Sequence, residues 1–477
     1  MDDRQIQQIV DKVMSRLSGS PASAPAPAAA RGAADVVPSG RMGVHADVDS
    51  AVRAAREAYE RLESGTMELR ERIVAAMREV TRRHVRELSE YAQRETGLGR
   101  VEDKVKKNLL VANRTPGPEI LRPPMAYSGD DGLTIEEHAP YGVIGAITPC
   151  TNPTETILCN GIGMVAGGNA VVFNVHPLAK RTSAWHVHLL NEAIVGAGGP
   201  PNLLTCVAEP SIESAGQLMK HPGTRIIVVT GGGEVVRAAM TCGKKTICGG
   251  PGNPPIVVDE TADLGRAARG IIDGSSFDNN VICSDEKETI VVQSVADKLR
   301  AELKRLGAYE LSESQTSRLC QVIFEDGGKH VNKRWVGKNA NVILREIGIS
   351  QPDECRIAFC DVDEQHPLVQ HEQLMPIMPI VRVKDWEEAI ACAQRAEHGF
   401  GHTAVMYSTH IEHMHRMARV INTCIFVKNA PSYAGLGAGG EGFTSWTIAH
   451  PTGEGLTTAV HFTRRRRCTL KDYFRIV

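Results

Sequence analysis

The residue best suited to covalent chemistry is Cys283, in the segment SSFDNNVICSDEKETIVV. A cysteine thiolate is a strong nucleophile, and the N–H groups at a helix start can stabilise both the thiolate and an oxyanion formed on it. The residues before Cys283 indicate a turn, and Ser284, Asp285 and Glu286 are typical of a helix start, although the two carboxylates would oppose ionisation of the thiol. Because the chain has 12 cysteines, a small buried hydrophobe is the alternative interpretation.

Two glycine clusters could let a ligand approach the backbone. In VVTGGGEVV (228–236), a strand pattern runs into three glycines and then into a helix pattern, a setting that suits a phosphate at a helix N-terminus. The second cluster is ICGGPGNPPIVVD (247–259). Either cluster could instead be a turn or an interdomain loop without a ligand, because the dinucleotide fingerprint G-x-G-x-x-G is absent after the first strand.

Two further clusters favour ordinary structure. His410, His413 and His415 include a helical i, i+3 pair, but no carboxylate or cysteine motif accompanies them, so we favour a solvated helix over a metal site. The arginines at 464–467 could bind a phosphate, although a solvent-facing or subunit-bridging strand is the simpler interpretation. The sequence also lacks a C-x-x-C pair, and no metal site is predicted.

The elements that position these residues change character along the chain. Residues 48–115 show the apolar spacing of amphipathic helices. From residue 141 onward, short β-branched runs end at Gly, Pro or Asn and alternate with helix-compatible stretches. This pattern predicts a parallel, doubly wound sheet, a second α/β block, and a hairpin outside the main sheet at 122–140. The predicted strand segments are 141–150, 169–177, 202–210, 224–232, 254–260, 289–293, 379–383 and 403–408.

The N-terminal 40 residues differ from the rest. Residues 1–18 carry apolar side chains at helical spacing, and residues 19–40 have the Ala, Pro, Ser and Gly composition of a flexible linker. Such a helix could pack on its own domain, help an oligomer to form, or enter the groove of a partner, and composition does not choose among these. The apolar stripe consists of Ile6, Ile9, Val10, Val13, Met14 and Leu17.

The composition excludes several classes of protein. The chain has 477 residues, of which 42% are hydrophobic and 23% charged, and its net charge of -2 disfavours a nucleic-acid binder. No apolar run reaches the ~18 residues that span a bilayer. The first residues lack the order of a secretory signal, so we expect a cytoplasmic protein with free thiols.

Together these motifs resemble the aldehyde dehydrogenase superfamily. They are most similar to its coenzyme-A-acylating branch, the acetaldehyde and propionaldehyde dehydrogenases of bacterial microcompartments. The resemblance extends from about residue 45 to the end, and the N-terminal helix and linker are similar to the encapsulation peptides of these enzymes. The motifs that carry it are TPCTNPTETI (148–157), VVTGGGEVV (228–236), SSFDNNVICSDEKE (275–288), HEQLMPIMP (371–379) and GGEGFTSWTIAHPTGEGLTTA (439–459) with TRRRRC (463–468).

The resemblance implies an α/β fold with two doubly wound domains and a small β oligomerisation flap. It implies a cofactor domain for NAD and coenzyme A at 41–119 and 139–250, and a catalytic domain at 251–442. The flap is expected at 120–138 and 456–477.

The resemblance also assigns roles to residues. Cys283 matches the nucleophile, and Asn152 matches the amide that shares the oxyanion with the cysteine N–H. Glu372 matches the carboxylate that holds the nicotinamide ribose, and Leu374 lies beside the nicotinamide. Pro149 and His176 fall in segments that line the adenosine side, and Thr230, Gly231 and Gly232 match the turn near the pyrophosphate. Thr148 and Gly249 complete the cofactor-binding residues that the resemblance implies.

The departures from the family pattern bear on the acyl acceptor. Hydrolytic relatives activate water with a Glu in the motif E-L-G-G, whereas the matching stretch here is Thr246–Gly250, with Ile247 at that place. They also carry a Lys near the adenosine, where this chain has Asn174, so the choice between NAD and NADP stays open.

We therefore expect oxidation of a short-chain aldehyde, propionaldehyde first and acetaldehyde next, to an acyl-CoA, with NAD and coenzyme A as cosubstrates and no metal. The expected partners are a microcompartment shell protein, bound through residues 1–18, and further copies of the chain in a homodimer or homotetramer, with no nucleic acid and no membrane. The alternatives are a hydrolytic aldehyde dehydrogenase that gives a free acid, or an inactive shell-binding scaffold.

Overall fold

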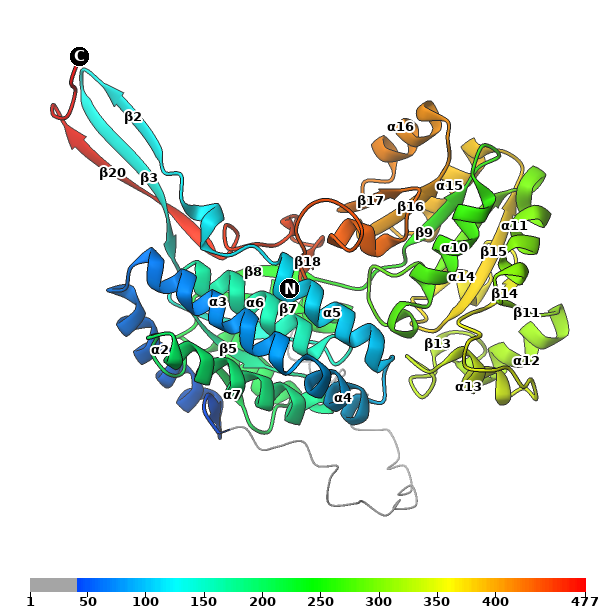
Figure 1. Cartoon of the computed structure of the whole chain (residues 1–477), viewed down its shortest axis with the longest axis horizontal. Coiled ribbons are helices and arrows are strands. Elements are labelled where there is room, and N and C mark those ends of the chain that lie inside the picture. The colour runs from blue at the N-terminus through cyan, green and yellow to red at the C-terminus, as the bar shows by residue number, and fades with distance from the viewer. Residues whose placement is uncertain (1–40) are drawn as a thin grey trace, which may run out of the picture. The chain divides into compact units, whose positions relative to one another are not determined.

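The computed structural model describes residues 41–477. The helix expected at 1–18 and the linker expected at 19–40 lie outside the described residues. The described part contains two parallel sheets with their helices and a three-stranded antiparallel arm (Figure 1).

Four amphipathic helices open the described chain, as the apolar spacing of 48–115 predicts. Side-chain caps begin the first two: Asp47 accepts the N–H of Ser50, and Thr66 accepts the N–H of Leu69. Their apolar stripes are buried in the core of the first domain. The helices are α2 (Val48–Glu63), α3 (Met67–Arg83), α4 (Val85–Thr96) and α5 (Val101–Arg114), and the 3-10 helix η1 (Pro118–Leu121) follows.

The first sheet is parallel, with the order β1-β6-β5-β4-β7-β8. Every residue of β4 and β5 is buried, as their continuous β-branched runs require of a sheet covered on both faces. From β4 the chain continues to β5 and β6 on one side and returns to β7 on the other. The crevice between the carboxyl ends of β4 and β7 is therefore a topological switch point, where ligands bind in such sheets.

The elements of the first sheet and its helices are β1 (Val44–His45), β4 (Val143–Ile147), α6 (Pro153–Ala166), β5 (Ala170–Asn174), η2 (Pro177–Ala179), α7 (Lys180–Gly196), β6 (Leu204–Val207), α8 (Ile212–Lys220), β7 (Ile226–Thr230), α9 (Gly233–Met240) and β8 (Lys245–Gly249).

The second sheet is also parallel, with the order β11-β14-β15-β10-β9-β16-β17, and it has its own buried core. Its elements are β9 (Pro255–Val258), α10 (Leu264–Ser275), η3 (Phe277–Asn280), β10 (Glu288–Val292), α11 (Gln293–Arg305), β11 (Tyr309–Glu310), α12 (Glu313–Ile323), β14 (Ala358–Asp361), α14 (Pro367–Gln370), β15 (Ile377–Val383), α15 (Trp386–Ala396), β16 (Thr403–Tyr407), α16 (Ile411–Val420), β17 (Ile425–Lys428) and η4 (Ser432–Leu436).

Several short elements lie between and after the strands of the second sheet. The hairpin β12 (Phe324–Glu325) and β13 (His330–Val331) and the helix α13 (Ala340–Arg345) lie between α12 and β14. A second short antiparallel pair, β18 (Ile448–Ala449) and β19 (Gly455–Leu456), follows the second sheet. This segment returns to the first domain, since Trp446 and Phe462 are buried in the first core and Thr447 Oγ1 lies 2.7 Å from Thr230 Oγ1.

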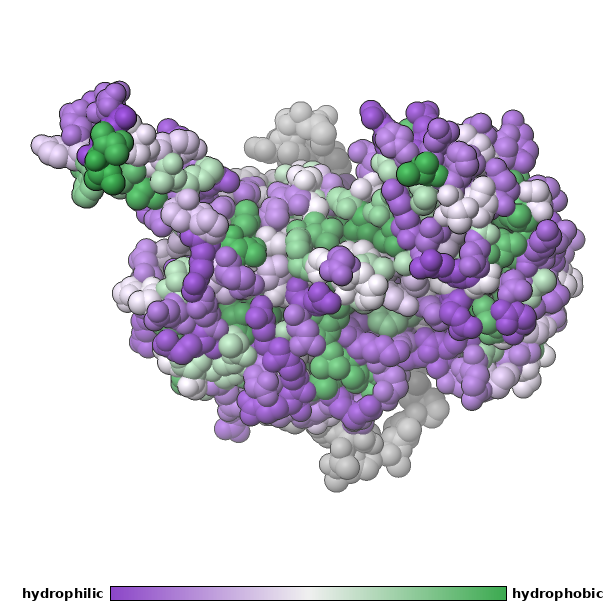
Figure 2. All heavy atoms as spheres, turned by 45° about the horizontal axis from the view of Figure 1, so that its top comes forward, coloured by the Kyte–Doolittle hydropathy of each residue, from purple (hydrophilic) through white to green (hydrophobic). Residues whose placement is uncertain are grey.

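The arm consists of three antiparallel strands that extend away from both sheets (Figure 1). The hairpin expected at 122–140 is present as β2 (Met125–Gly129) and β3 (Gly132–Pro140). The C-terminal strand β20 (Thr463–Lys471) pairs with β3 along its whole length, and it carries the exposed arginine run on a strand, as the sequence predicts. Apolar side chains gather at the tip of the arm (Figure 2).

Candidate active site

The carboxyl ends of the first sheet's strands bring most of the predicted cofactor-binding residues to one edge. Thr148 and Pro149 directly follow β4, and His176 follows the neighbouring strand β5. Thr230 ends β7, and Gly231 and Gly232 lead into α9. Gly249 ends β8, in register with Thr230. These residues therefore surround the switch point between β4 and β7.

Three other predicted residues lie at the amino ends of the second sheet's strands. Cys283 precedes β10, and Glu372 and Leu374 precede the neighbouring strand β15. Five residues connect Gly249 at the end of β8 to Pro255 at the start of β9, so the carboxyl edge of the first sheet adjoins the amino edge of the second. Hydrogen bonds across the boundary, described below, join the two edges.

The prediction of a helix start after Cys283 is wrong. Ser284, Asp285 and Glu286 form a turn that leads into β10. The segment is instead shaped by three successive left-handed residues, Asp278, Asn279 and Asn280, with φ of 46°, 57° and 66°. Asn and Asp tolerate this conformation better than other side chains, because their short polar groups hydrogen-bond locally. The Cys283 thiol therefore does not lie at a helix N-terminus.

Buried polar side chains hold the turn around Cys283. The ammonium of Lys287 donates to the carbonyls of Asp285 at 2.9 Å and Ile282 at 3.2 Å. The side-chain amide of Asn280 donates to the carbonyls of Ser275 and Glu286. These bonds satisfy the backbone of an irregular buried segment and fix the position of the nucleophile.

The surroundings of Cys283 favour the neutral thiol. Burial and, to a smaller extent, the nearby Glu372 carboxylate raise the pKa of Cys283 to about 12, while Lys287 acts in the opposite direction. In the free protein the thiol is therefore protonated at neutral pH. A thiolate forms only when a base, a substrate or a bound cofactor changes this balance.

Asn152 occupies the N-cap position of α6 with its side chain buried. Its Oδ1 accepts a hydrogen bond from Lys107 Nζ at 2.6 Å, and its Nδ2 donates to Thr151 Oγ1 at 3.2 Å. The second N–H of this amide has no recorded partner among residues 41–477. It is a donor of the kind that stabilises an oxyanion.

The switch point suits a dinucleotide pyrophosphate. The start of α9 has no side-chain cap, and a Cβ added at Gly232 or Gly233 would meet nothing within 4 Å, so the N–H groups there are open to a ligand. The buried hydroxyl of Thr148 also has no partner in the described part of the chain. His176, by contrast, uses its Nδ1 to accept the N–H of Leu178, and no recorded bond joins it to another predicted site residue.

Glu372 links the two edges through the backbone. Its Oε1 accepts the N–H of Gly252 at 3.2 Å, in the segment between β8 and β9. Burial raises the pKa of Glu372 to about 7, so this carboxyl changes its charge near neutral pH. Leu374 has φ of 53°, an unusual conformation for a leucine, which fixes the backbone next to Glu372.

His402 is a site residue that the sequence analysis missed. It directly precedes β16, and a Cβ added at Gly252 would lie 2.8 Å from its ring and 2.9 Å from the Cys283 carbonyl. Burial lowers the pKa of His402 well below its usual value, so the ring is neutral. Its Nδ1 contacts Thr403 Oγ1, and its Nε2 has no partner among the described residues. The only signal in the sequence was a histidine at the start of a β-branched run.

The position where hydrolytic relatives carry a glutamate is apolar here. Ile247 is fully buried in β8, and the neighbouring Cys248 is buried as well. The structure therefore offers no carboxylate at that place to activate water.

The histidine cluster near residue 410 lies at the start of α16. No group of three or more potential metal ligands occurs among the described residues. The favoured solvated helix is correct only in part, because His413 is buried and its Nδ1 lies 2.8 Å from Asp259 Oδ2. Its ring also stacks on Trp386.

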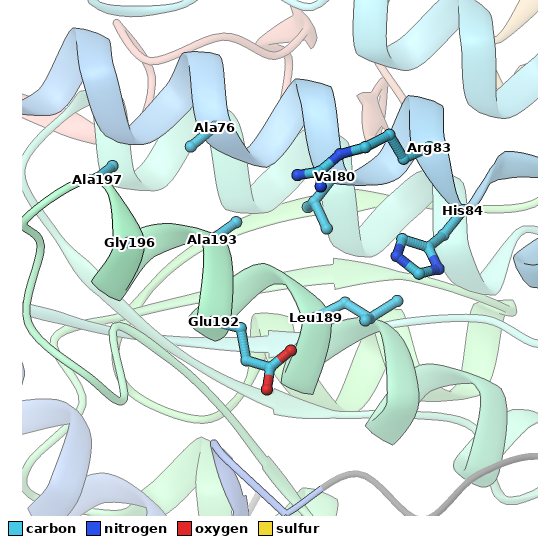
Figure 3. A pocket seen from close by; sticks show the side chains of 9 residues that line it. All are labelled: Ala76, Val80, Arg83, His84, Leu189, Glu192, Ala193, Gly196 and Ala197. Atoms are coloured by element: carbon cyan, nitrogen blue, oxygen red, sulfur yellow. The ribbon is translucent and has the colours of Figure 1, made fainter.

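A surface hollow of about 430 Å³ lies between α3 and α7 (Figure 3). Its lining includes Val80, His84, Leu189 and Glu192 and contains none of the predicted site residues.

No helix within residues 41–477 is long and apolar enough to cross a membrane.

Known proteins that are similar to this chain identify its family. The aldehyde dehydrogenase family profile matches residues 27–322 and 357–443. The acetaldehyde dehydrogenase (acetylating) EutE of Salmonella typhimurium is 48% identical over 482 residues, and the alignment covers 100% of both chains.

Two solved structures are also similar. A propionaldehyde dehydrogenase from the fucose utilisation microcompartment of Clostridium phytofermentans has a TM-score of 0.89 and 45% identity, covering 92% of this chain and 100% of that one. The Rhodopseudomonas palustris propionaldehyde dehydrogenase, solved with bound CoA and an acylated cysteine, has a TM-score of 0.88 and 47% identity, covering 90% and 98%. The predicted fold class is thus confirmed, and this chain belongs to the aldehyde dehydrogenase family, in its coenzyme-A-acylating branch.

Proposed function

We propose that this chain oxidises a short aldehyde, propionaldehyde or acetaldehyde, and transfers the acyl group to coenzyme A through a thioester on Cys283. The observation that carries the proposal is a partly exposed cysteine at the junction of two sheet edges, with a buried amide donor at Asn152 and the apolar Ile247 where hydrolytic relatives carry a carboxylate. The named activities of the relatives above support the same reaction.

The first half-reaction forms an enzyme thioester. The sulfur of Cys283 bonds to the aldehyde carbon, and the carbonyl oxygen becomes an oxyanion that the Asn152 amide and the Cys283 N–H stabilise. The thiol proton must leave as the bond forms, and we propose that the free Nε2 of His402 accepts it, against the burial that lowers the pKa of this ring. Bound NAD supplies the acceptor for the hydride that leaves the aldehyde carbon.

The cofactor would lie across the switch point. The residues proposed to hold it are those at the carboxyl edge of the first sheet, with the open N–H groups of α9 toward the pyrophosphate. Glu372 would accept hydrogen bonds from the nicotinamide ribose, and Leu374 would pack beside the ring. Asn174 donates to the carbonyl of Ser211 and accepts from Ser214, so its amide is already engaged within the domain.

The second half-reaction transfers the acyl group to a thiol. Water needs a general base to attack a thioester, and the place expected for that base holds Ile247. A thiol is an intrinsically better nucleophile, so coenzyme A can attack without a carboxylate. The acyl–sulfur bond to Cys283 breaks as the new one forms, and Cys283 departs as a thiolate. The exchange of one thioester for another is close to balanced in energy and should be reversible.

NADH formation from propionaldehyde, with and without coenzyme A, tests the proposal. Without coenzyme A, we expect a burst of about one NADH per active site followed by slow turnover, because the thioester accumulates. With coenzyme A, steady turnover should appear, and acyl-CoA with NADH should return aldehyde. Equal steady rates with free acid as the product would establish the hydrolytic alternative, and no NADH in either case would favour the inactive scaffold.

The nucleophile has its own test. Cys283→Ala should abolish the burst and the turnover, while circular dichroism and NAD binding stay unchanged. Cys248→Ala, which removes another buried thiol of the same region, should retain activity. Substantial turnover by the Cys283 variant would show that another cysteine, or none, is the nucleophile.

The cellular setting is proposed from the same relatives. Enclosure within a cytoplasmic microcompartment would confine a reactive aldehyde near the enzyme. Residues 1–18 would bind a shell protein, and the arm would join copies of the chain into a dimer or tetramer.

A further inference from the structure

A buried lysine joins the proposed oxyanion donor to the loop that carries the nucleophile. Lys107, on α5, has no exposed surface. Its Nζ lies 2.6 Å from Asn152 Oδ1 and 2.6 Å from Asp278 Oδ2, and 3.4 Å from Glu155 Oε1. The side chains of Asp278 and Glu155 are equally buried.

This contact fixes which way the Asn152 amide faces. An ammonium group has three donors and no acceptor, so only the carbonyl oxygen of Asn152 can face it. Burial alone would lower the pKa of Lys107, but the Asp278 and Glu155 carboxylates outweigh this and raise it, so the group is charged. Without the ammonium, the same two carboxylates would attract the amide N–H groups, and the donor would turn toward them.

The same ammonium reaches the nucleophile loop. Asp278 is the first of the three left-handed residues that precede Cys283. Lys107 therefore ties the N-terminus of α6, in the first domain, to the segment of the second domain that carries the thiol. An oxyanion site made from both domains needs such a link, since its two donors belong to different domains.

We propose that Lys107 is a positioning residue that orients Asn152 for the oxyanion formed on Cys283. Lys107 itself touches neither substrate nor sulfur in this scheme. The inference rests on the proposed function, because it gives Asn152 the role of oxyanion donor.

Lys107→Met and Lys107→Gln form a matched pair for the test. Both remove the charge at similar length, but only glutamine keeps an N–H donor for Asn152 Oδ1. The measurement is the rate constant of the NADH burst with propionaldehyde under single-turnover conditions. We expect Lys107→Met to slow the burst about tenfold to a hundredfold, as loss of an oxyanion donor does, and Lys107→Gln to recover most of that loss.

Lys104→Met is the control for general damage to the buried network. Lys104 is as buried as Lys107 and donates to the same oxygen of Asp278 at 2.8 Å, but it does not contact Asn152. We expect its burst to stay within about threefold of the original chain, since no oxyanion donor is misplaced. A loss equal to that of Lys107→Met would overturn the proposal in favour of a purely structural role.

A double-mutant cycle with Asn152→Ala supplies a readout that structural damage would not move. If Lys107 acts through Asn152, Lys107→Met should cause no further loss in the Asn152→Ala background. Additive losses would overturn the proposal, and so would equal rates for the Met and Gln variants. If Lys107→Met does not fold, the cycle is run with Lys107→Leu, which also offers no N–H donor to Asn152 Oδ1, and an equal loss of tenfold or more in both backgrounds is the contradicting result.

Two further observations separate this proposal from the proposed function. If the unaltered chain makes no NADH, the function itself fails. If the unaltered chain is active and Asn152→Ala retains its rate, only the oxyanion assignment and the role of Lys107 fail. Alkylation of Cys283 by iodoacetamide should change less than about threefold in Lys107→Met, because Lys107 orients the amide and is not among the charges that set the Cys283 pKa.

Discussion

The surroundings of Cys283 keep its thiol protonated in the resting protein. Lys287 hydrogen-bonds to backbone carbonyls of the turn. Among the charged groups, Glu372 does most to raise the pKa of Cys283. The resting thiol is therefore protonated and resistant to oxidation, which follows thiolate character. Reactivity must be created when substrate and cofactor bind. The buried cysteines Cys206 and Cys360 also have raised pKa values.

Replacing Glu372 should make the free thiol more reactive. Glu372→Gln removes a negative charge that raises the pKa of Cys283, while the amide oxygen can still accept the N–H of Gly252. The pKa of Cys283 should fall, so its alkylation by iodoacetamide at pH 8 should speed up roughly threefold to tenfold. Mass spectrometry of Cys283 after timed alkylation measures this.

Glu286→Gln is the control for that experiment. Glu286 is also a buried carboxyl close in sequence, but it is not among the largest contributions to the Cys283 pKa. Its variant should alkylate Cys283 at the original rate. Identical rates for Glu372→Gln and the original chain would show that the Glu372 charge does not help to hold the thiol neutral.

The site residues differ in how far sequence could predict them. Cys283, with its turn residues, and the glycines after β7 could be found from local pattern, and Asn152 only through the family resemblance. Lys107 could not be found, because its i, i+3 neighbour Lys104 makes the segment look like an ordinary charged helix face. Both lysines are in fact buried on carboxylates that come from distant segments. His402 could not be found for a similar reason, because its place in the site depends on which strands are neighbours in the sheet.

At the scale of elements, β10 and η4 are joined by a buried carboxyl. Glu286, just before β10, accepts the N–H of Ser432 at 2.7 Å and its hydroxyl at 2.9 Å. Burial raises the pKa of Glu286 to about 7 even so, because desolvation outweighs these bonds. A Cβ on Gly274 would collide with this carboxyl at 2.3 Å, so α10 packs against it only through a glycine.

This carboxyl should make stability depend on pH. Its pKa in the folded chain, about 7, exceeds the value of 4.5 for an exposed glutamate, so folding takes up a proton between these values. The contribution of Glu286 to stability is therefore present below pH 4.5 and lost as pH rises through 7. Glu286→Gln cannot ionise, so its free energy of unfolding relative to the original chain should rise by about 3 kcal/mol from pH 4.5 to 8.

Urea unfolding at several pH values measures that difference. The comparison cancels every other titrating group that the two chains share. Glu60→Gln, an exposed glutamate on α2 that pairs with Arg56, should show no such trend. A difference between Glu286→Gln and the original chain that does not vary with pH would mean that folding does not shift the pKa of Glu286.

Sequence pattern predicted the elements better than their junctions. The four early helices and all eight predicted strand segments are present, because apolar periodicity and β-branched runs reflect burial directly. The helix start at Ser284–Glu286 failed because the same residue types also suit a turn. Here Asp285 Oδ2 accepts the N–H of Ile282, and Glu286 bonds to Ser432, so both carboxylates serve the loop.

At the scale of the whole molecule, the N-terminal segment should be dispensable for chemistry. All the proposed site residues lie between Lys107 and His402, and the described fold begins at Arg41. Deleting residues 1–18 should leave kcat and KM for propionaldehyde unchanged in solution and should remove co-localisation with a shell. Enzyme assays and fluorescence imaging of tagged chains measure the two effects. Lost activity or lost soluble expression would show that the segment supports the fold.

The arm should control the oligomeric state. A three-stranded sheet needs another layer over its apolar side chains, and the arm exposes several: Tyr127 is 53% exposed, Leu470 40% and Phe474 70%. Both outer strands, β2 and β20, also have unpaired edges. We therefore expect light scattering to report a dimer or tetramer for the original chain, and Tyr127→Glu with Leu470→Glu to shift it toward monomer. Ile411→Glu, at a 77% exposed isoleucine of the catalytic domain, should not. A monomeric original chain, or equal dissociation by the Ile411 variant, would contradict the assignment of the arm as the oligomerisation surface.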